Sequence, residues 1–502
     1  MAVALVCGLA RIQSSELCLD DSYIHLAYAR SLRAGEGLSY NPHDWETGAT
    51  SPLWVLLLAA WPFGLPGGLA LKLFGLAWHV LGTWLFMRLA AALLPSAAEP
   101  AAKPSPSLLS TGAALLFACD PLAVQAATSG MEVSLATALA LGFVLALHAG
   151  RPLMAAGMAA VCCCVHLGLC VLINNTSVGC ALTRRSRAAL WPLLAALLAS
   201  ASYAAYCQAV SGYPLPNTYY VKGRPFALEQ LKYLVLEVLP QQPLVTCGLG
   251  AVLAAIGSWQ ALRARSALAW VLFAALTGLL ATGATRAQYP GVQFAQSRYF
   301  APFFWLLPLA AAAGVAHFRK WPALGALGIP LAFSLFMCMR AAAVQHAQEQ
   351  GVTRLHVEPA RFVSTLSDVR VLGVEGAGAL RYFTPRSLRV VDVVGLNDRR
   401  FAHVRGKQGE RLCRLLQAGI THFAYPEPWS DFLNKGFELQ RLAAFTQPAY
   451  AQTVPPLDWT VIVARVRRVR SEALQSCGHA SPADAHGPSP EPASAHAQGL
   501  TR

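Results

Sequence analysis

Charged residues are scarce in this 502-residue sequence, since Asp, Glu, Lys and Arg together make up only 13% while 55% of the residues are hydrophobic. A soluble protein of this length could not bury so much apolar surface. Apolar runs of about 18 residues or more, long enough to cross a ~30 Å hydrocarbon core, recur along the chain. The composition therefore excludes an ordinary soluble enzyme and predicts a polytopic α-helical membrane protein.

Signals of several other classes are also missing. Among the 13 cysteines no CxxC motif pairs with a second one, so no zinc site is predicted. The cysteine-rich run 162–170 is interpreted as small buried thiols in helices. The net charge of +14 would favour nucleic acid in a soluble protein, but no nucleic-acid-binding motif accompanies it. We attribute this charge to topology, because Lys and Arg lie mostly in short loops.

Ten apolar segments are the candidate membrane spans, and they predict about 10–11 transmembrane helices. The fifth is interpreted as a hairpin of two short helices. A further apolar segment, 52–63, is too short to span and is interpreted as a partly embedded helix. The ten segments lie near residues 1–15, 69–92, 107–126, 132–149, 153–182, 189–210, 231–256, 267–284, 300–316 and 322–340.

The character of the sequence changes after about residue 345. Strand-like runs alternate there with helix-like stretches, which predicts a small α/β domain. Its expected strands lie at 368–374, 388–396, 421–426 and 459–466. The end of the chain is rich in Ala, Ser, Pro and His, and is predicted to be disordered. We therefore divide the chain into a transmembrane domain (1–344) with a catalytic loop (19–52), an α/β domain (345–470) and a disordered tail (471–502).

The basic loops predict the orientation in the membrane. They fall on one side if 153–182 is a hairpin, and the positive-inside rule makes that side cytoplasmic. The opposite side receives the 19–52 loop, the 128–132 turn, the loops 216–225 and 285–300, and the α/β domain. The sequence thus predicts a multi-pass plasma (inner) membrane protein with these segments extracytoplasmic. Because the first span is short, the completeness of the N-terminal start is left open.

Two adjacent acids, Asp20 and Asp21, follow the first apolar segment directly. Carboxylates at a membrane boundary are costly to bury and tend to mark sites or ion paths. Like charges held close together raise one pKa, which suits a general base. The alternative is an ordinary acidic loop. The pair is the sequence's first candidate for catalytic residues.

The stretch that the pair opens, LDDSYIHLAYARSLRAGEGLSYNPHDWETGATSPLW (19–54), resembles the first extracytoplasmic loop of the C-type membrane glycosyltransferases. It looks closest to the branch of the mycobacterial terminal β-(1→2) arabinofuranosyltransferase and its bacterial relatives. The resemblance covers residues 19–465, and further elements fit in order. These are SGMEVSLATAL (129–139), PLPNTYYVK (214–222), SRYFAPFF (297–304) and GAGALRYFTPRSLRVVDVVGLND (376–398).

The resemblance implies an inverting glycosyltransferase. Such an enzyme takes a sugar from a polyprenyl-phosphate donor and attaches it to a cell-envelope glycan, lipid or protein acceptor; here a pentose such as arabinofuranose is favoured. An Asp of the pair would deprotonate the acceptor hydroxyl, and the transition state is oxocarbenium-like. The departing phosphate needs cations and hydrogen-bond donors. The candidates for that task are Lys222, Tyr219, Tyr220, Arg298 and Tyr299.

Glu46, Glu132 and His25 are the candidate sugar or acceptor ligands. Each candidate also has a structural alternative. Lys222 and Arg298 with their tyrosines would serve equally as interfacial anchors. Glu132 would stabilise a helix N-terminus, while the alternatives are packing for His25 and a solvated loop acid for Glu46.

Several points stay open at the sequence level. Relatives of this branch carry an Arg-Pro-acid-Gly turn in the hairpin, whereas this chain has Val165, His166 and Leu167 before Gly168. That departure keeps a catalytically inactive scaffold as an alternative. A lipid-linked sugar transporter or flippase is a second alternative, although no internal repeat is seen. A divalent cation, Mg²⁺ or Mn²⁺, near the Asp pair is a weak option, because two carboxylates alone do not build a cation cage. The sequence shows no phosphate-cradling Gly-rich loop between a strand and a helix, which fits a carrier-lipid donor that needs no nucleotide-binding fold.

Overall fold

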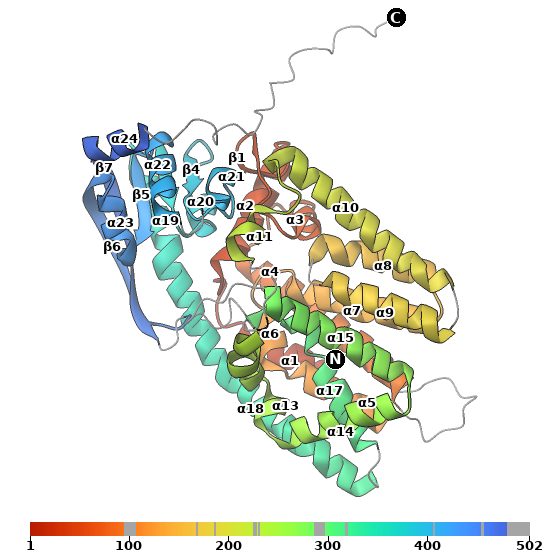
Figure 1. The fold of residues 1–502 in the computed structure, drawn as a ribbon. Coiled ribbons are helices and arrows are strands. Elements are labelled where there is room, and N and C mark those ends of the chain that lie inside the picture. The colour runs from red at the N-terminus through yellow and green to blue at the C-terminus, as the bar shows by residue number, and fades with distance from the viewer. Residues whose placement is uncertain are drawn as a thin grey trace, which may run out of the picture.

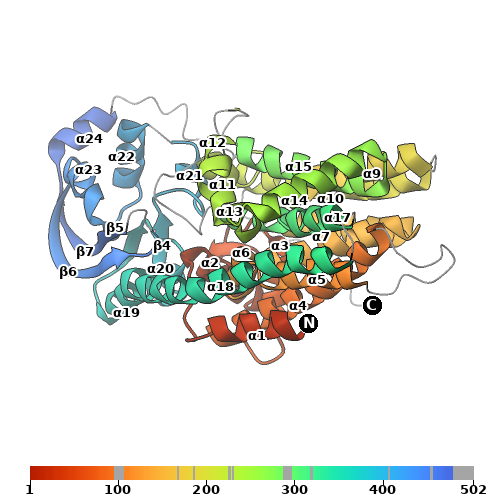
Figure 2. The same ribbon diagram turned by 90° about the horizontal axis from the view of Figure 1, so that it is seen from below.

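The structure, a computed structural model, consists of a body of packed helices with a mixed sheet domain at one end (Figures 1 and 2). This arrangement confirms the expected fold class. The residues that the structure describes are 1–94, 107–166, 169–184, 187–223, 228, 231–285, 297–316, 320–404, 407–452 and 456–478.

Among the described residues, four helices are long and apolar enough to cross a membrane, or five if one bent pair counts as a span. The four long helical segments are α4 (Gly68–Leu93), Arg187–Ser211 with α10 (Trp191–Ser211), α15 (Ala267–Thr285) and Ala326–Thr365. The other apolar helices have 10–17 residues; they are α1 (Ala2–Arg11), α7 (Val133–His148), α8 (Pro152–Val165), α9 (Leu169–Arg184) and the segment containing α17 (Leu306–Val315).

The bent pair is α5 (Leu108–Ala118) and α6 (Pro121–Ala127), which meet at 61°. The sequence explains the break, because the Asp120 carboxylate accepts a hydrogen bond from the Ala123 N–H (2.8 Å) and Pro121 occupies the first turn of α6. The bend leads the chain directly into the 128–132 turn, which reaches the candidate site.

Two of the expected spans had different outcomes in the structure. Segment 153–182 forms the expected two short helices, α8 and α9, although Leu167 and Gly168 of the turn lie outside the described residues. The expectation of one helix at 231–256 was wrong. Pro240, Pro243 and Gly248, whose φ is +68°, interrupt it. The resulting short pieces are α12 (Leu231–Tyr233), a π-helix (Leu234–Val238), a 3₁₀ turn (Leu239–Gln241), α13 (Pro243–Thr246) and α14 (Leu249–Arg263).

Helix α18 (Lys320–Val352) links the membrane helices to the sheet domain and runs across position 344/345. It continues through a π-helical turn (Thr353–Val357) into α19 (Glu358–Thr365). Its Glu349 pairs with Lys72 of α4 at 2.6 Å, and both side chains are fully buried. Because a buried charge needs a partner, this pair fixes α18 against α4.

The sheet domain is mixed, with strand order β4-β3-β5-β7-β6. Strand β3 pairs in parallel with β4 and β5, and β7 pairs antiparallel with β5 and β6. All four predicted strands are present, whereas β6 was missed because only two of its 14 residues are buried and its sequence lacks hydrophobic alternation. The strands are β3 (Val371–Val374), β4 (Arg389–Asp392), β5 (His422–Pro426), β6 (Phe437–Tyr450) and β7 (Leu457–Val469).

Short helices cover the sheet. A disulfide between Cys413 and Cys477 joins two of them, α22 and α24. Helix α24 occupies the first residues of the segment predicted as a disordered tail, and 479–502 lies outside the described residues. The helices are α20 (Ala379–Tyr382), α21 (Arg399–Ala402), α22 (Gln408–Gln417), α23 (Ser430–Asn434) and α24 (Ser471–Gly478).

Candidate active site

Helix α2 (Asp20–Arg33) begins at the acidic pair and lies between the membrane helices and the sheet domain. Carboxylates are favourable in the first turn of a helix, where the macrodipole is positive. Successive residues of a helix point roughly 100° apart. Asp20 therefore faces the sheet domain, and Asp21 faces the loops that join the membrane helices.

The carboxylate of Asp20 is held by backbone N–H groups. Its two oxygens accept hydrogen bonds from Gly378 and Ala379, each at 2.8 Å, and His356 Nδ1 lies 3.7 Å away. Gly378 is required here because a Cβ at that position would lie 1.9 Å from the Asp20 carbonyl oxygen. Asp20 thus joins α2 to the start of α20.

The partner of Asp20 is a glycine-containing loop, 375–378, together with the first residue of helix α20; the loop joins strand β3 to that helix. The sequence analysis did not recognise a loop of this kind. A carboxylate of the same chain, and not a phosphate, takes its N–H groups. The loop therefore binds the two parts of the protein together.

The carboxylate of Asp21 has two cationic partners. Its Oδ2 accepts hydrogen bonds from Lys222 Nζ at 3.0 Å and from a guanidinium nitrogen of Arg298. Lys222 ends α11 (Asn217–Lys222), and Arg298 lies just before a 3₁₀ turn (Ala301–Phe303). The side chains of Asp21, Lys222 and Arg298 are 24%, 18% and 4% exposed.

The two cations decide the protonation state of Asp21. Burial alone would raise the pKa of this carboxyl, but Lys222 and Arg298 together hold its pKa well below the ordinary range. The same contact outweighs the burial of Lys222 and raises the pKa of its ammonium. All three groups are therefore charged at neutral pH.

Six of the ten predicted site residues line one cavity beside Asp21: Asp21, His25, Glu132, Lys222, Arg298 and Tyr299. They come from four segments that are far apart in the sequence. The volume of this cavity is about 30 Å³. Tyr299 accepts a hydrogen bond at its hydroxyl from Arg298 (3.3 Å), and the guanidinium lies 4.9 Å from the Tyr299 ring centre. The structure thus brings the acid, both cations and one of the three tyrosines together.

His25 and Glu132 form the other polar wall of this cavity. His25 Nε2 lies 3.5 Å from Glu132 Oε2. Among the described residues, His25 Nδ1 and Glu132 Oε2 have no hydrogen-bond partner, although both atoms are buried. Burial lowers the pKa of His25, partly offset by Glu132. Buried polar atoms without partners are costly, so a ligand with hydroxyl groups would find ready partners here.

The remaining four predicted residues lie outside the cavity. Besides Asp20, they are Glu46, Tyr219 and Tyr220. Tyr219 is 40% exposed. The ring of Tyr220 packs against His403 of the sheet domain at 4.4 Å between ring centres.

Glu46 follows strand β2 (Asp44–Trp45) and is not a solvated loop acid. It accepts hydrogen bonds from Asn217 Nδ2 (2.9 Å) and from the Arg399 N–H (3.3 Å). Burial, reinforced by the negative charge of Asp398, raises the pKa of Glu46 to about 8. Glu46 therefore connects the 19–52 loop with α11 and α21.

Thr218 is a cavity residue that the sequence analysis did not single out. It lines the cavity, and its hydroxyl donates a hydrogen bond to the Gly48 carbonyl (3.2 Å). The sequence pointed to Thr218 only through the run Pro-Asn-Thr at 216–218, and this motif was used to predict the tyrosines and the lysine that follow it.

The residues present do not fit a divalent cation. Among the described residues, no group of three or more His, Cys, Asp or Glu could hold a metal ion. The carboxylate of Asp21 is paired with two cations, and both oxygens of Asp20 accept hydrogen bonds from backbone N–H groups. We therefore derive no step through a metal.

Fold and site together define a polytopic membrane protein whose α/β domain packs beside a partly buried carboxylate–cation cluster. No family model matches the chain, and no curated protein matches its sequence. The fold is that of the C-type membrane glycosyltransferases, as solved structures show.

Two of these are structures of ArnT from Cupriavidus metallidurans. The one bound to undecaprenyl phosphate is 13% identical, covers 93% of this chain and 97% of that chain, and has a TM-score of 0.58. The apo structure is 14% identical over 92% of this chain and 96% of that chain, with a TM-score of 0.59. A structure of the arabinofuranosyltransferase AftD from Mycobacteria is 16% identical, covers 93% of this chain but only 41% of that chain, and has a TM-score of 0.50.

Proposed function

We propose that the protein is an inverting glycosyltransferase that uses a polyprenyl-phosphate-linked sugar as donor. The observation that carries the proposal is the cluster of Asp21, Lys222 and Arg298 at one cavity wall. It supplies a base and two phosphate-binding cations, the groups that this transfer needs. The fold shared with ArnT, solved with undecaprenyl phosphate, supports a carrier-lipid donor.

In the proposed reaction, the donor phosphate binds Lys222 and Arg298 and so competes with Asp21 for them. Arginine and lysine bind phosphate through charge-assisted hydrogen bonds. Once Asp21 loses these partners, burial raises its pKa and it becomes a better base. Donor binding would thus activate the base at the point where it is needed.

The transfer itself follows from these positions. Asp21 accepts the proton of the acceptor hydroxyl, and the oxygen attacks the anomeric carbon from the face opposite the phosphate. The bond between that carbon and the phosphate oxygen breaks, and the polyprenyl phosphate leaves with the electron pair, its charge stabilised by Lys222 and Arg298. His25 and Glu132 would bind sugar hydroxyls, and the Glu132 charge favours an oxocarbenium-like sugar.

This assignment divides the acidic pair. Asp21 is proposed as the catalytic residue because it lines the cavity, whereas Asp20 is proposed as a positioning residue because both its oxygens are engaged by Gly378 and Ala379. Tyr299 would contact the phosphate, while Tyr219 and Tyr220 would contribute from the outer face of α11.

We further propose that the sheet domain and the cavity lie on the extracytoplasmic side. Two independent arguments support this. The positive-inside rule favours that side for both. The Cys413–Cys477 disulfide also favours it, because disulfides persist in oxidising compartments. The acceptor would then be a component of the cell envelope, and the sugar a pentose such as arabinofuranose, as the loop motifs suggest.

The test is a transfer assay with purified protein in detergent. Radiolabelled polyprenyl-phosphate pentoses and hexoses would be offered with simple glycoside acceptors. We expect transfer from one donor by the wild type and a loss of about 10²–10⁴-fold in Asp21→Asn. Asp458→Asn, which changes an exposed acid on β7, is the matched control and should keep full activity.

Two outcomes would overturn the proposal. One is undiminished transfer by a folded Asp21→Asn variant. The other is no transfer from any donor by the folded wild type, combined with movement of the labelled donor across the bilayer of proteoliposomes, which would identify a transporter.

A further inference from the structure

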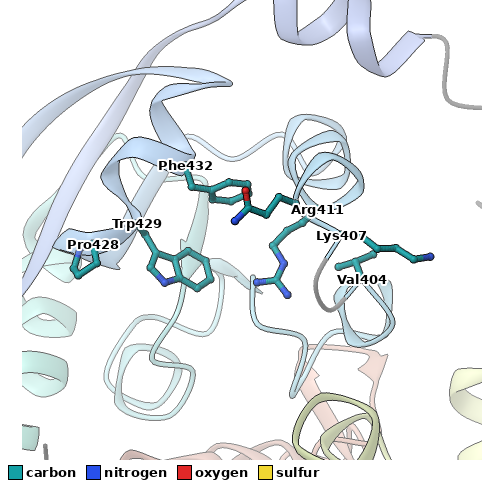
Figure 3. A pocket seen from close by; sticks show the side chains of 7 residues that line it. Val404, Lys407, Arg411, Pro428, Trp429 and Phe432 are labelled. Atoms are coloured by element: carbon teal, nitrogen blue, oxygen red, sulfur yellow. The ribbon is translucent and has the colours of Figure 1, made fainter. Parts of the chain in front are cut away.

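The sheet domain has a second cavity, which none of the predicted site residues lines. It lies at the carboxyl end of the parallel strands, between the start of α22 and the segment after β5 (Figure 3). Its volume is about 420 Å³, against about 30 Å³ for the cavity beside Asp21. Ligand sites usually occupy about 300–1,000 Å³, and in α/β sheets they lie beyond the carboxyl ends of strands. We call it the outer pocket.

One wall of the outer pocket is apolar and flat. Pro428, Trp429 and Phe432 form it, and Figure 3 shows the Trp429 ring directed toward the opposite wall. Trp429 and Phe432 are partly buried against the core of the sheet domain, so their rings are held in place without being covered. Rigid aromatic faces of this kind supply contact area at little entropic cost.

The opposite wall carries polar side chains. Lys407, Gln408 and Arg411 come from the start of α22, and the Arg411 guanidinium lies 5.8 Å from the Trp429 ring centre. Lys407 is also paired with Glu410 at 3.1 Å, which weakens the electrostatic attraction of Lys407 for an anionic ligand. The pocket thus offers the Gln408 and Arg411 side chains as hydrogen-bond donors beside the aromatic rings, whereas the Lys407 ammonium is directed away from Trp429.

The chemistry that matches such a site is a sugar ring. A sugar has an apolar C–H face that packs on an aromatic ring, and its edge is lined with hydroxyls that accept from Arg, Lys and Gln. A purely apolar ligand would not use the polar wall, and a simple inorganic anion would not use the aromatic wall.

Ring contacts join the segment that borders the outer pocket to α11, the helix whose last residue lines the cavity beside Asp21. Val404 of the pocket follows His403, whose ring stacks on Tyr213 at 3.7 Å and packs against Tyr220 at 4.4 Å. Tyr220 lies on α11, which ends at Lys222. The two cavities therefore lie on elements that contact each other.

We propose that the outer pocket binds a sugar unit of the acceptor glycan, several units away from the hydroxyl that is modified. The proposal rests on the proposed function, because it assigns the acceptor of that reaction to an extended glycan. Binding at a remote unit lowers the KM of long acceptors without changing the chemical step for short ones.

The first experiment measures binding at equilibrium, without transfer. Purified full-length protein would be titrated with linear neutral hexasaccharides, an arabinan and a mannan, and with a phosphorylated form of each. We expect a neutral hexasaccharide to bind the wild type, and Trp429→Ala to weaken that binding at least tenfold. Trp459→Ala on β7 is the matched control, and it should bind as the wild type does.

Because Trp429 contributes to the core, Gln408→Ala at the exposed rim is a second variant whose folding is not at risk. We expect it to weaken hexasaccharide binding severalfold. Binding of only the phosphorylated forms, unaffected by Trp429→Ala, would overturn the proposal. So would equal binding by all variants, or binding of no oligosaccharide.

The second experiment separates this inference from the transfer reaction. With a hexasaccharide acceptor, Trp429→Ala should raise KM at least tenfold; with a disaccharide acceptor it should leave kcat/KM unchanged. If the wild type transfers no sugar but the binding results hold, the proposed function fails and the outer pocket stands. If transfer occurs and Trp429→Ala affects both acceptors equally, the outer pocket proposal fails.

Discussion

The two cavities of this protein are built in opposite ways. The inner one, beside Asp21, is small and lined by residues from several segments between positions 21 and 396, and its charges neutralise one another. The outer pocket is large and lined by residues 404–432 of one domain, and its aromatic rings are held open to solvent. A reaction centre needs preorganised charges from several directions, whereas a binding site needs a shape and a few donors. Changes at the inner cavity should therefore be severe, and changes farther out should be graded.

Lys222→Gln tests the inner cavity, and apart from Asp21→Asn its expected effect is the largest. Removing one of two phosphate-binding cations should lower kcat/KM by about 10²-fold. It also removes a cation that lowers the pKa of Asp21, so this pKa should rise. Because the base must be unprotonated, the acid limb of the kcat/KM profile should move to higher pH.

The measurement is the pH profile of transfer by the wild type and by Lys222→Gln. Lys232→Gln, an exposed lysine on the neighbouring α12, is the control and should leave the profile unchanged. An acid limb that stays in place or moves to lower pH in Lys222→Gln would show that Asp21 is not the general base.

Asp20→Ala tests the junction between the two regions. The change leaves the N–H groups of Gly378 and Ala379 without their acceptor, which should cost about 1–3 kcal/mol of stability. Transfer should fall much less than in Asp21→Asn, because no group in contact with substrate is lost. Thermal unfolding and turnover, measured on the same sample, check this. Unchanged unfolding with abolished turnover would reverse the roles proposed for the two acids.

The sequence predicted the parts of this arrangement better than their contacts. Long apolar runs and alternating strands revealed the fold, because burial against lipid or core leaves a periodic pattern. The pairing of Asp21 with Lys222 and Arg298 was not visible, since it depends on how loops about 200 and 280 residues away fold back. The role of Asp20 was equally hidden, because its partners are backbone N–H groups, which carry no side-chain signature.

Glu46→Gln tests the junction through its pH dependence. The pKa of Glu46 is raised to about 8 in the folded protein, so the folded state holds this proton more tightly than the unfolded chain does. The resulting stability is fully present below the unfolded pKa of about 4.3 and is lost as pH rises through 8. Each pH unit in that window should cost up to ~1.4 kcal/mol.

Glu46→Gln should remove this slope, while transfer at pH 7 should change severalfold at most. Unfolding midpoints at several values between pH 5 and 9 would measure it. Equal slopes in wild type and variant would show that Glu46 ionises normally in the folded protein.

Replacing Cys413 and Cys477 together by Ser tests the sheet domain and should have the smallest effect on transfer. The disulfide closes a segment of 64 residues, so its loss should lower the stability of the sheet domain by about 2–4 kcal/mol. Transfer to a disaccharide should be unchanged below the unfolding temperature. A large loss of disaccharide transfer at low temperature would mean that the two regions are more closely coupled than their construction indicates.

The continuous helical segment Ala326–Thr365 has a mechanical consequence. At 1.5 Å per residue it is about 60 Å long, roughly twice the thickness of the hydrocarbon core. One continuous helical segment therefore connects the membrane helices to the sheet domain, and the Lys72–Glu349 pair fixes it to α4. A tilt of the segment within the bilayer would therefore strain the contacts of Asp20 and Glu46 that hold the sheet domain against α2 and α11. Membrane thickness, by setting that tilt, would then set the strain on these contacts.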